Sequence, residues 1–354
     1  MFGLTQPKTP TAALPALQGI WKADIEDHVI ALAWSPTGKK LAAAAIGGPI
    51  TIFSDDGSAQ LTLPGHRFGT NAVAWSQDGQ HFASAGQDGK VILWDIPTRS
   101  PKAVLEGGAS WVEHLAWNPL GGTQKGTPHL LATAAGKKLK LWNAEGELVR
   151  EFADHPSTIA SLSWKPKSQF LTTAAYSRLA IFTAGSHTPF RQFTWKGSIL
   201  TLAWSPNCKY IATGDQDATV HFWFEKDGKD LQMWGYPTKV RELSWDATSR
   251  YLATGGGAEV TVWDCIRSPE GSTPITLKSH TDIITALRFQ HAGPLLASAG
   301  QDGRLFIWHP GQHARPLAGV AINSPLTQLA WSPNDAWLAI SAENGGVAVL
   351  AKPH

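Results

Sequence analysis

A twelve-residue phrase occurs twice in this chain and constrains the fold more than any other feature. Residues 84–95 read SAGQDGKVILWD, and residues 298–309, which lie 214 positions further on, read SAGQDGRLFIWH. A second phrase, LAWSP or a looser variant of it, recurs along almost the whole length. Repeats with a period of a few tens of residues are typical of chains that stack copies of one structural unit. The duplication is therefore architectural.

Eight copies of the second phrase can be counted, and each ends at an aromatic anchor residue. The steps between successive anchors are 41, 42, 47, 40, 41, 44 and 42 residues. In each copy a short apolar run ends at the anchor, and a second, a third and a weaker fourth run follow, separated by polar turns. Short β-branched and aromatic runs between Gly, Pro, Asp and Asn predict antiparallel strands rather than helices. The anchors are Trp34, Trp75, Trp117, Trp164, Trp204, Trp245, Phe289 and Trp331.

Four strands that repeat with a period of about 40–45 residues, with Trp closing the third, resemble the WD40-repeat family of β-propellers. The dipeptide Trp-Asp occurs at Trp94 and at Trp263, and Gly-His occurs at Gly65. The resemblance covers roughly residues 15–350. It implies an all-β, eight-bladed WD40-type β-propeller. The alternative is seven full blades with one degenerate copy packed outside.

The last copy ends after its third run, at residues 346–350, and therefore lacks a fourth strand. The segment before the first anchor resembles the fourth strands of other copies. We therefore expect residues 16–22 to pair with the last blade, which would close the propeller and remove two open sheet edges. Residues 1–14 are expected to form a flexible N-terminal tail, and residues 15–354 a single domain.

Polar residues recur at fixed positions within the repeats. In the WD40 family a His, a Ser or Thr, an Asp and the Trp of the third strand form a hydrogen-bonded chain. A hydrolase triad is the competing interpretation of His, Ser and Asp, but a triad has no reason to be copied into separate blades. A structural role is therefore favoured. The matching residues are His66, Ser84, Asp88 and Trp94, then His280, Ser298, Asp302 and Trp308, and, without a His, Thr213, Asp217 and Trp223.

Signatures of metal and cofactor chemistry are weak. His309 and His313 are four residues apart, but Pro310 and Gly311 predict a loop rather than one helical face. The glycine-rich residues 254–259 lie in a strand-to-strand turn, where no helix follows to hold phosphate. We therefore expect no metal, no cofactor and no enzymatic activity.

Composition indicates a globular protein, since 43% of the residues are hydrophobic and 16% are charged. A net charge of +2 is too small to indicate a surface for polyanions. The two cysteines favour a reducing compartment. No run approaches the roughly 18 apolar residues of a membrane helix. The sequence therefore predicts a cytoplasmic protein without membrane contact.

One face of the predicted propeller carries the candidate binding residues. The turns that lead into the first strand of each blade, and those that join its second and third strands, share this top face. Trp, Tyr and Arg most often anchor protein interfaces. We expect a scaffold that binds another protein with an acidic and partly apolar surface. The candidates are Arg67, Phe68, Trp111, Glu113, Trp195, Lys196, Trp234, Tyr236, Lys239 and Arg241.

Two other classes of function stay open. An enzyme or a small-ligand site at the channel mouth would need convergent polar groups, and the sequence offers His114, Glu242 and Arg241. Single-stranded nucleic acid could stack on exposed aromatic rings beside Lys and Arg. The near-neutral net charge disfavours that second alternative.

Overall fold

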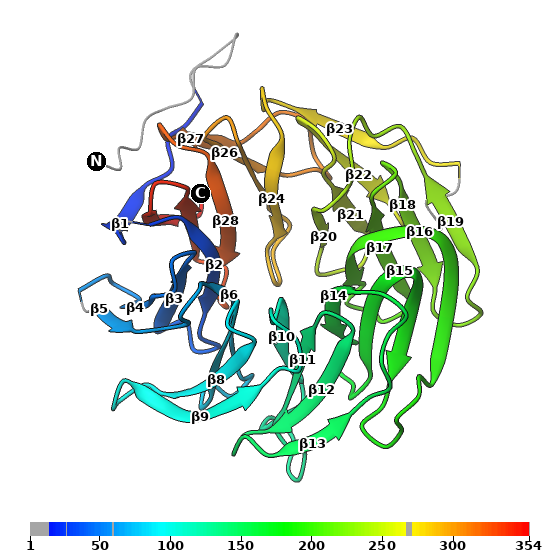
Figure 1. Cartoon of the computed structure of the whole chain (residues 1–354). Coiled ribbons are helices and arrows are strands. Elements are labelled where there is room, and N and C mark those ends of the chain that lie inside the picture. Colours follow the sequence, from blue (N-terminus) through cyan, green and yellow to red (C-terminus); the bar gives the residue numbers. More distant parts are fainter. Residues whose placement is uncertain (1–13, 26, 59, 267–270, 354) are drawn as a thin grey trace. The chain divides into compact units, whose positions relative to one another are not determined.

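The computed structural model describes residues 14–25, 27–58, 60–266 and 271–353, and the regular elements among them are β-strands (Figure 1). The chain divides into two compact units, one of residues 1–32 with 203–354 and the other of residues 33–202. We describe each unit separately. In the part of the chain so described, no helix has the length and apolar character required to cross a bilayer.

The unit of residues 33–202 carries the strands of the first repeats. The strands at its two ends extend a few residues beyond it. The first sheet has the order β2 (Val29–Trp34), β3 (Lys40–Ala45), β4 (Ile50–Ser54) and β5 (Gln60–Leu63). The next has β6 (Thr70–Trp75), β7 (Phe82–Gly86), β8 (Lys90–Asp95) and β9 (Ser100–Glu106). A third has β10 (His114–Trp117), β11 (Leu130–Ala135), β12 (Lys138–Asn143) and β13 (Leu148–Glu151).

The other unit carries three further four-stranded sheets. The first has the order β20 (Leu243–Trp245), β21 (Tyr251–Thr254), β22 (Glu259–Asp264) and β23 (Ile275–Lys278). The second has β24 (Ile284–Phe289), β25 (Leu296–Gly300), β26 (Arg304–Trp308) and β27 (Ala318–Ala321). The third has β1 (Gly19–Asp24), β30 (Gly346–Ala351), β29 (Trp337–Ala342) and β28 (Leu326–Trp331).

The remaining sheet has six strands and corrects the predicted blade count. Its order is β14 (Ile159–Trp164), β15 (Leu171–Phe182), β16 (Arg191–Trp204), β17 (Tyr210–Asp215), β18 (Val220–Phe224) and β19 (Asp230–Met233). The described residues thus form seven sheets, as in a seven-bladed β-propeller, and the prediction of eight blades is wrong.

The cause of the difference is strand continuity in the fourth and fifth repeats. β16 is 14 residues long and runs from the end of the fourth repeat into the anchor of the fifth without a turn. β15 is 12 residues long and takes up two runs of the fourth repeat. The alternative of seven full blades with one degenerate copy outside is confirmed in its blade count. Its outlying copy is not found among the described residues, because all eight anchors lie within strands.

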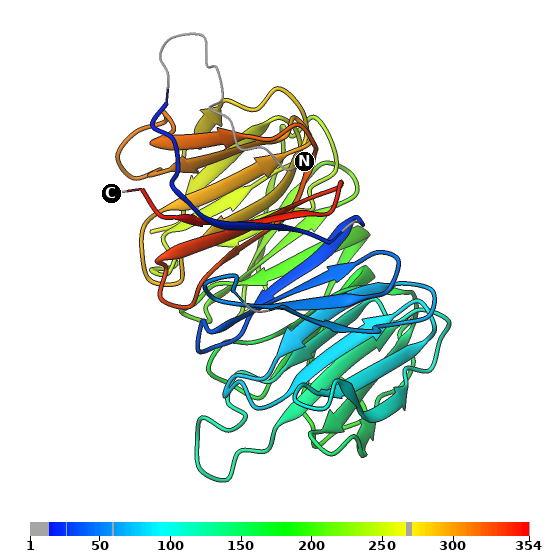
Figure 2. The same ribbon diagram turned by 90° about the vertical axis from the view of Figure 1, so that its left-hand side faces the viewer.

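The predicted pairing of the N-terminal segment with the last sheet is confirmed. β1 runs antiparallel to β30, and Figure 2 shows the dark blue and red strands side by side. In this pairing Trp21 lies opposite Val349 and Asp24 opposite Gly346. Ahead of β1, Ala16 bridges to Gly319 of β27. The predicted flexible tail, residues 1–14, lies almost wholly outside the described residues, and the single-domain assignment stays a prediction.

The second strands of the sheets lie deepest in each core. Phe82–Gly86, Leu130–Ala135 and Leu296–Gly300 are buried at every position. Strands covered on both faces read as continuous apolar runs. Small residues predominate among these positions, which is why Ala-rich runs follow the anchors.

Five of the anchor tryptophans link their sheet to the preceding repeat. In these links the indole nitrogen of an anchor donates a hydrogen bond to the backbone carbonyl just before the preceding anchor. This geometry explains why Trp recurs at this position. The bonds are Trp75 to Ala33 at 3.2 Å, Trp117 to Ala74 at 3.3 Å, Trp164 to Ala116 at 2.9 Å, Trp245 to Ala203 at 3.2 Å, and Trp331 to Arg288 at 3.0 Å.

Candidate functional site

Two of the repeated polar sets form continuous hydrogen-bonded chains. In the β6–β9 sheet, Trp94 Nε1 lies 2.8 Å from Ser84 Oγ, and Ser84 Oγ lies 2.8 Å from His66 Nε2. His66 Nδ1 lies 2.9 Å from Asp88 Oδ1. The β24–β27 sheet repeats this geometry, with 2.8 Å from Trp308 to Ser298, 2.8 Å from Ser298 to His280 and 3.1 Å from His280 to Asp302.

The donors and acceptors assign the tautomer of His66. Trp94 can only donate to Ser84, so the Ser84 hydroxyl donates to Nε2 and the Nδ1 proton points to Asp88. Burial lowers the pKa of His66 despite the Asp88 carboxylate, which keeps the ring neutral at pH 7. Asp88 also accepts from the backbone N–H groups of Arg67 and Lys90. Every polar atom in this hydrogen-bonded chain thus has a partner, as a packing element requires.

The third set is only partly joined. Trp223 Nε1 donates to Thr213 Oγ1 at 3.4 Å, whereas Asp217 accepts from Thr219 Oγ1 instead. His221, which the sequence analysis did not select, is buried and bonds to Asp230 at 2.9 Å.

Tyr236 takes the place of the missing His in the β20–β23 sheet. Its hydroxyl lies 2.8 Å from Thr254 Oγ1 and accepts from Trp263 Nε1 at 2.9 Å. Burial raises the pKa of Tyr236 to about 12. The sequence analysis assigned Tyr236 to the binding surface, but its hydroxyl is committed to internal bonds. Tyr236 and Thr254 have the same separation in sequence as His66 and Ser84, and this signal was available in the sequence.

In the unit of residues 33–202, hydrogen bonds join neighbouring loops. In each case the donor is a buried residue at, or just before, the first strand of a sheet, and the acceptor is a carbonyl of the preceding sheet. Thr70 Oγ1 donates to the Gly48 carbonyl, Val112 N–H donates to that of Gly86 at 3.0 Å, and Ile159 N–H donates to that of Gly136 at 2.8 Å. In an antiparallel sheet, the loop into the first strand and the turn from second to third strand meet at one edge. We call these the upper loops, and those at the opposite edge the lower loops.

The upper loops of this unit expose large apolar side chains. Phe68 is 62% exposed and Trp111 is 55% exposed, and the Arg67 guanidinium lies 5.1 Å from the Phe68 ring centre. Ile46, at 40% exposure, lies on the turn between β3 and β4, and Tyr176, at 53%, lies within β15, where the second and third runs of the fourth repeat meet. We call Ile46, Phe68, Trp111 and Tyr176 the aromatic loop surface. Sequence reasoning missed Ile46 and Tyr176 because it weighed only the loops that lead into first strands.

The other candidates of this unit are less accessible. Glu113 is half-buried, and burial raises its pKa. Trp195 is also half-buried, and a Cβ added to Gly197 would lie 2.6 Å from its indole nitrogen, so the ring folds back over its own strand. Lys196 beside it is exposed.

In the other unit, Trp234 is 74% exposed, and Lys239 and Arg241 are exposed on the same loop into β20. Met233, Trp234 and Trp263 contribute to a shallow pocket of about 470 Å³. Trp234, Lys239 and Arg241 thus form a second exposed group, on the loop that also carries Tyr236.

The polar groups proposed for the channel mouth have shifted pKa values. Burial lowers the pKa of His114 to about 4. Burial raises the pKa of Glu242 to about 7, against the opposing effect of Arg241 and Arg288. His114 belongs to the unit of residues 33–202, and Arg241 and Glu242 belong to the other unit.

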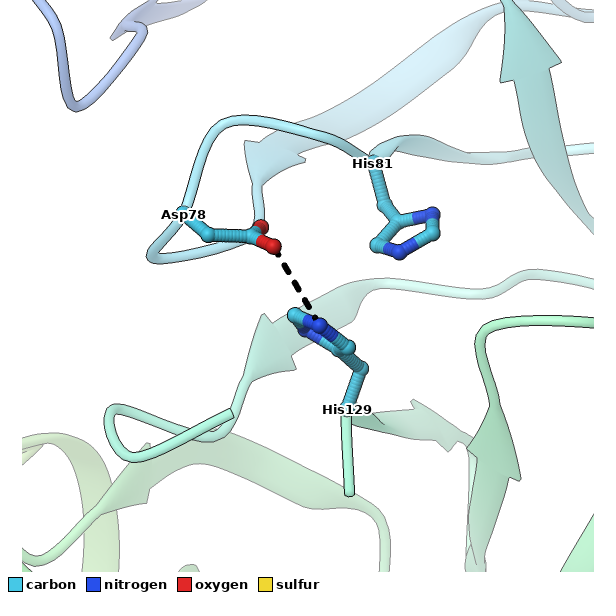
Figure 3. A group of neighbouring side chains, drawn as sticks. All are labelled: Asp78, His81 and His129. Atoms are coloured by element: carbon cyan, nitrogen blue, oxygen red, sulfur yellow. Dashed lines mark ion pairs between the residues drawn. The ribbon is translucent and has the colours of Figure 1, made fainter. Parts of the chain in front are cut away.

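The lower loops carry a further cluster, which sequence reasoning missed. Asp78, His81 and His129 bring one possible ligand atom each to within 4.8 Å of one another (Figure 3). Asp78 and His81 belong to one repeat and His129 to the next, where it ends an insertion that the other repeats lack, so the repeat spacing did not bring them together. The other His pair occupies a turn, where His313 N–H donates to the His309 carbonyl at 3.2 Å.

Comparisons with known proteins agree with this architecture. The family model described as "WD domain, G-beta repeat" matches residues 57–95, 188–223 and 271–309. Two of these ranges contain the hydrogen-bonded chains from Ser84 to Trp94 and from Ser298 to Trp308. A crystal structure of the computationally designed Ika8 protein superimposes with a TM-score of 0.80 at 21% identity, over 95% of this chain and 100% of that one.

Curated relatives match parts of the chain. A rice "Chromatin assembly factor 1 subunit FAS2 homolog" is 41% identical over 124 residues, which is 32% of this chain and 23% of the relative. The Dictyostelium discoideum "Anaphase-promoting complex subunit cdc20" is 28% identical over 50% of this chain and 38% of its own length. "WD repeat-containing protein slp1" of Schizosaccharomyces pombe is 30% identical over 48% of this chain and 36% of its own length. The chain thus spans well under half of these relatives. The repeat matches, the anchor bonds and the His–Ser–Asp–Trp chains together show that this chain carries WD40 repeats.

Proposed function

We propose that this WD40-repeat protein is a non-enzymatic scaffold that binds another protein through the aromatic loop surface. The observation that carries the proposal is the exposure of Phe68 and Trp111 on hydrogen-bonded neighbouring loops. Exposed contiguous apolar side chains are typical of interaction sites. Trp and Arg are the most frequent anchors of such sites, while the surrounding residues mainly exclude water.

The charges beside this surface favour a partner with acidic groups. Arg67 and Lys137 are exposed on the upper loops, whereas Asp154 is held by Lys138 at 2.8 Å. An acidic side chain of the partner would find positive charge next to the Phe68 and Trp111 rings. A partner with an acidic and partly apolar surface fits this arrangement best.

The named relatives support an interaction role. Two of them carry names that describe subunits of larger assemblies, a chromatin assembly factor and an anaphase-promoting complex. A fold alone does not specify function, so the support for this chain comes from its own exposed loops.

We also infer a cytoplasmic location. The chain has only two cysteines, Cys208 and Cys265, and Cys265 is buried. So few cysteines cannot form a disulfide framework, and this fits a reducing compartment better than an oxidising one. Fractionation of cells that express the tagged chain would test the location.

The test of binding has two stages. Affinity capture with the tagged full chain, followed by mass spectrometry, identifies a partner, and the purified pair then gives a dissociation constant. The variant Phe68→Ala/Trp111→Ala should weaken binding at least ~30-fold, because a central anchor contributes about 2 kcal/mol or more. Its circular dichroism spectrum should match that of the wild type.

The chain offers a matched control. Phe190 is 64% exposed in the same unit but lies on a lower loop, against Phe170 at 5.5 Å. Phe190→Ala should leave the dissociation constant within about twofold. If Phe190→Ala abolishes binding while the upper-loop variant binds normally, the partner uses the opposite loops and the proposal is wrong.

A further inference from the structure

The lower loops of residues 33–202 place three metal-binding side chains together. Asp78 lies in the turn between β6 and β7, and His81 directly precedes β7. His129 directly precedes β11, at the end of the insertion formed by residues 118–129. Figure 3 shows the Asp78 carboxylate and the two imidazole rings facing a common space. The cluster thus connects the turn of one sheet to the insertion of the next.

The distances suit coordination by a small cation. Asp78 Oδ2 lies 3.3 Å from His129 Nε2, and the two imidazole ring centres are 4.8 Å apart. Ligands about 2.0–2.1 Å from a tetrahedral zinc ion are separated by roughly 3.3 Å. The Asp78–His129 separation therefore already matches, and a ring nitrogen of His81 lies within 4.8 Å of both other ligand atoms.

The surrounding structure orients each of these groups. Asp78 Oδ1 accepts from Ser76 Oγ at 2.7 Å and from the Gln80 backbone at 3.1 Å, which turns Oδ2 toward His129. The His81 ring stacks on Trp117 at 5.6 Å. Metal ligands are characteristically held by such secondary contacts.

The insertion is closed at its base by one side chain. Asn118 donates to the Pro128 carbonyl at 3.0 Å and accepts from Leu130 N–H at 2.9 Å. These bonds fix the backbone on both sides of His129. The position of this ring is therefore set by the fold rather than by a free loop end.

Glycine keeps the space beside the ligand atoms open. A Cβ at Gly122 would lie 2.7 Å from Asp78 Oδ2 and 2.8 Å from His129 Nε2. Gly122 also has a φ of +70°, which a side chain would strain. Asp78 and His129 side chains each retain 21% exposure, so an ion can reach them from solvent.

We propose that Asp78, His81 and His129 form a binding site for a divalent transition-metal ion of the zinc type. Imidazole and carboxylate together are typical ligands of Zn²⁺. Three protein ligands leave at least one coordination position for water. The bound ion would tie the insertion to the β6–β7 turn, at the loops opposite the aromatic loop surface.

The experiment is calorimetric titration of ZnCl₂ into the full chain after EDTA treatment and removal of the chelator. We expect one ion per chain. The variants His129→Gln and Asp78→Asn should each weaken binding at least ~10-fold. The control is His313, which is exposed in the turn of His309 and His313, away from the proposed site. His313→Gln should bind Zn²⁺ as the wild type does. Absence of binding, or equal affinity of all four proteins, would overturn the proposal.

A second measurement tests the site in the wild-type chain itself, so that its result does not depend on whether a variant folds. Co²⁺ replaces Zn²⁺ in the wild-type chain, and its visible absorption reports coordination by imidazole and carboxylate. The spectrum should appear with one equivalent of Co²⁺ and should be lost when His81→Gln is titrated. A wild-type chain that gives only the spectrum of hydrated Co²⁺ contradicts the assignment.

Discussion

Among single residues, the polar chains show how buried groups depend on one another. Ser84 and Ser298 are completely buried, and each bridges a Trp indole and a His ring. In the β20–β23 sheet, Tyr236 takes the place of the His, and its hydroxyl bonds to Thr254 and Trp263. The requirement is therefore a satisfied set of donors rather than a particular residue type.

Asp88→Ala should destabilise the protein by roughly 1–3 kcal/mol, because a buried donor left without its acceptor carries the desolvation penalty. Asp88 is the acceptor for His66 Nδ1 and for the N–H groups of Arg67 and Lys90. Asp302→Ala should behave alike. Denaturant midpoints at pH 7 measure the change in the free energy of unfolding.

Asp217→Ala provides the matched control, since Asp217 is exposed and bonds to the Thr219 hydroxyl. It should cost clearly less than Asp88→Ala. A loss of partner binding in Asp88→Ala at unchanged stability would instead point to a functional role of this hydrogen-bonded chain.

Among elements, β1 and β16 have the largest consequences. β1 covers the edge of β30, which would otherwise present unpaired backbone groups. β16 continues through a position where the repeat pattern predicted a turn, and it joins two repeats into one sheet. The position of a residue within its repeat predicts whether it lies in a strand. The lengths of the strands decide how many separate sheets form.

Deletion of residues 1–24 should lower the melting temperature by several degrees, because β30 loses its partner strand and buried Leu17 is removed. A change of about 1 kcal/mol shifts the melting temperature of a mid-sized domain by about 2–4 °C. The shorter deletion of residues 1–12 spares β1 and the Ala16 bridge, and it should change little. Equal melting temperatures for both deletions would show that β1 pairing adds no stability.

For the whole molecule, the balance of charges bears on the class of partner. The chain has 30 basic and 28 acidic residues, so no general excess of positive charge attracts a polyanion. Binding at the aromatic loop surface then depends mainly on apolar contact, with a few charges for orientation. The competing nucleic-acid function depends on phosphate contacts.

Salt dependence distinguishes the two. The affinity for the protein partner should fall less than ~10-fold between about 50 and about 200 mM salt, since few phosphate-like contacts are involved. A single-stranded oligonucleotide bound through six to ten phosphates would lose about 10³–10⁵ in affinity over that range. Calorimetry of the full chain with the identified partner and with an oligonucleotide measures both slopes. A steep fall for the partner complex would favour the nucleic-acid alternative.

The sequence by itself determined the WD40-type repeats, their strand character and the pairing of the N-terminal segment, because these follow from local pattern and period. It also placed Phe68 and Trp111 on loops. The spacing of Tyr236 and Thr254 also matched that of His66 and Ser84, so the internal bonding of Tyr236 could have been predicted. The sheet count and the approach of His129 to Asp78 and His81 were decided by tertiary structure. Strand continuity and the path of the 118–129 insertion set them, and repeat spacing carries no information about either.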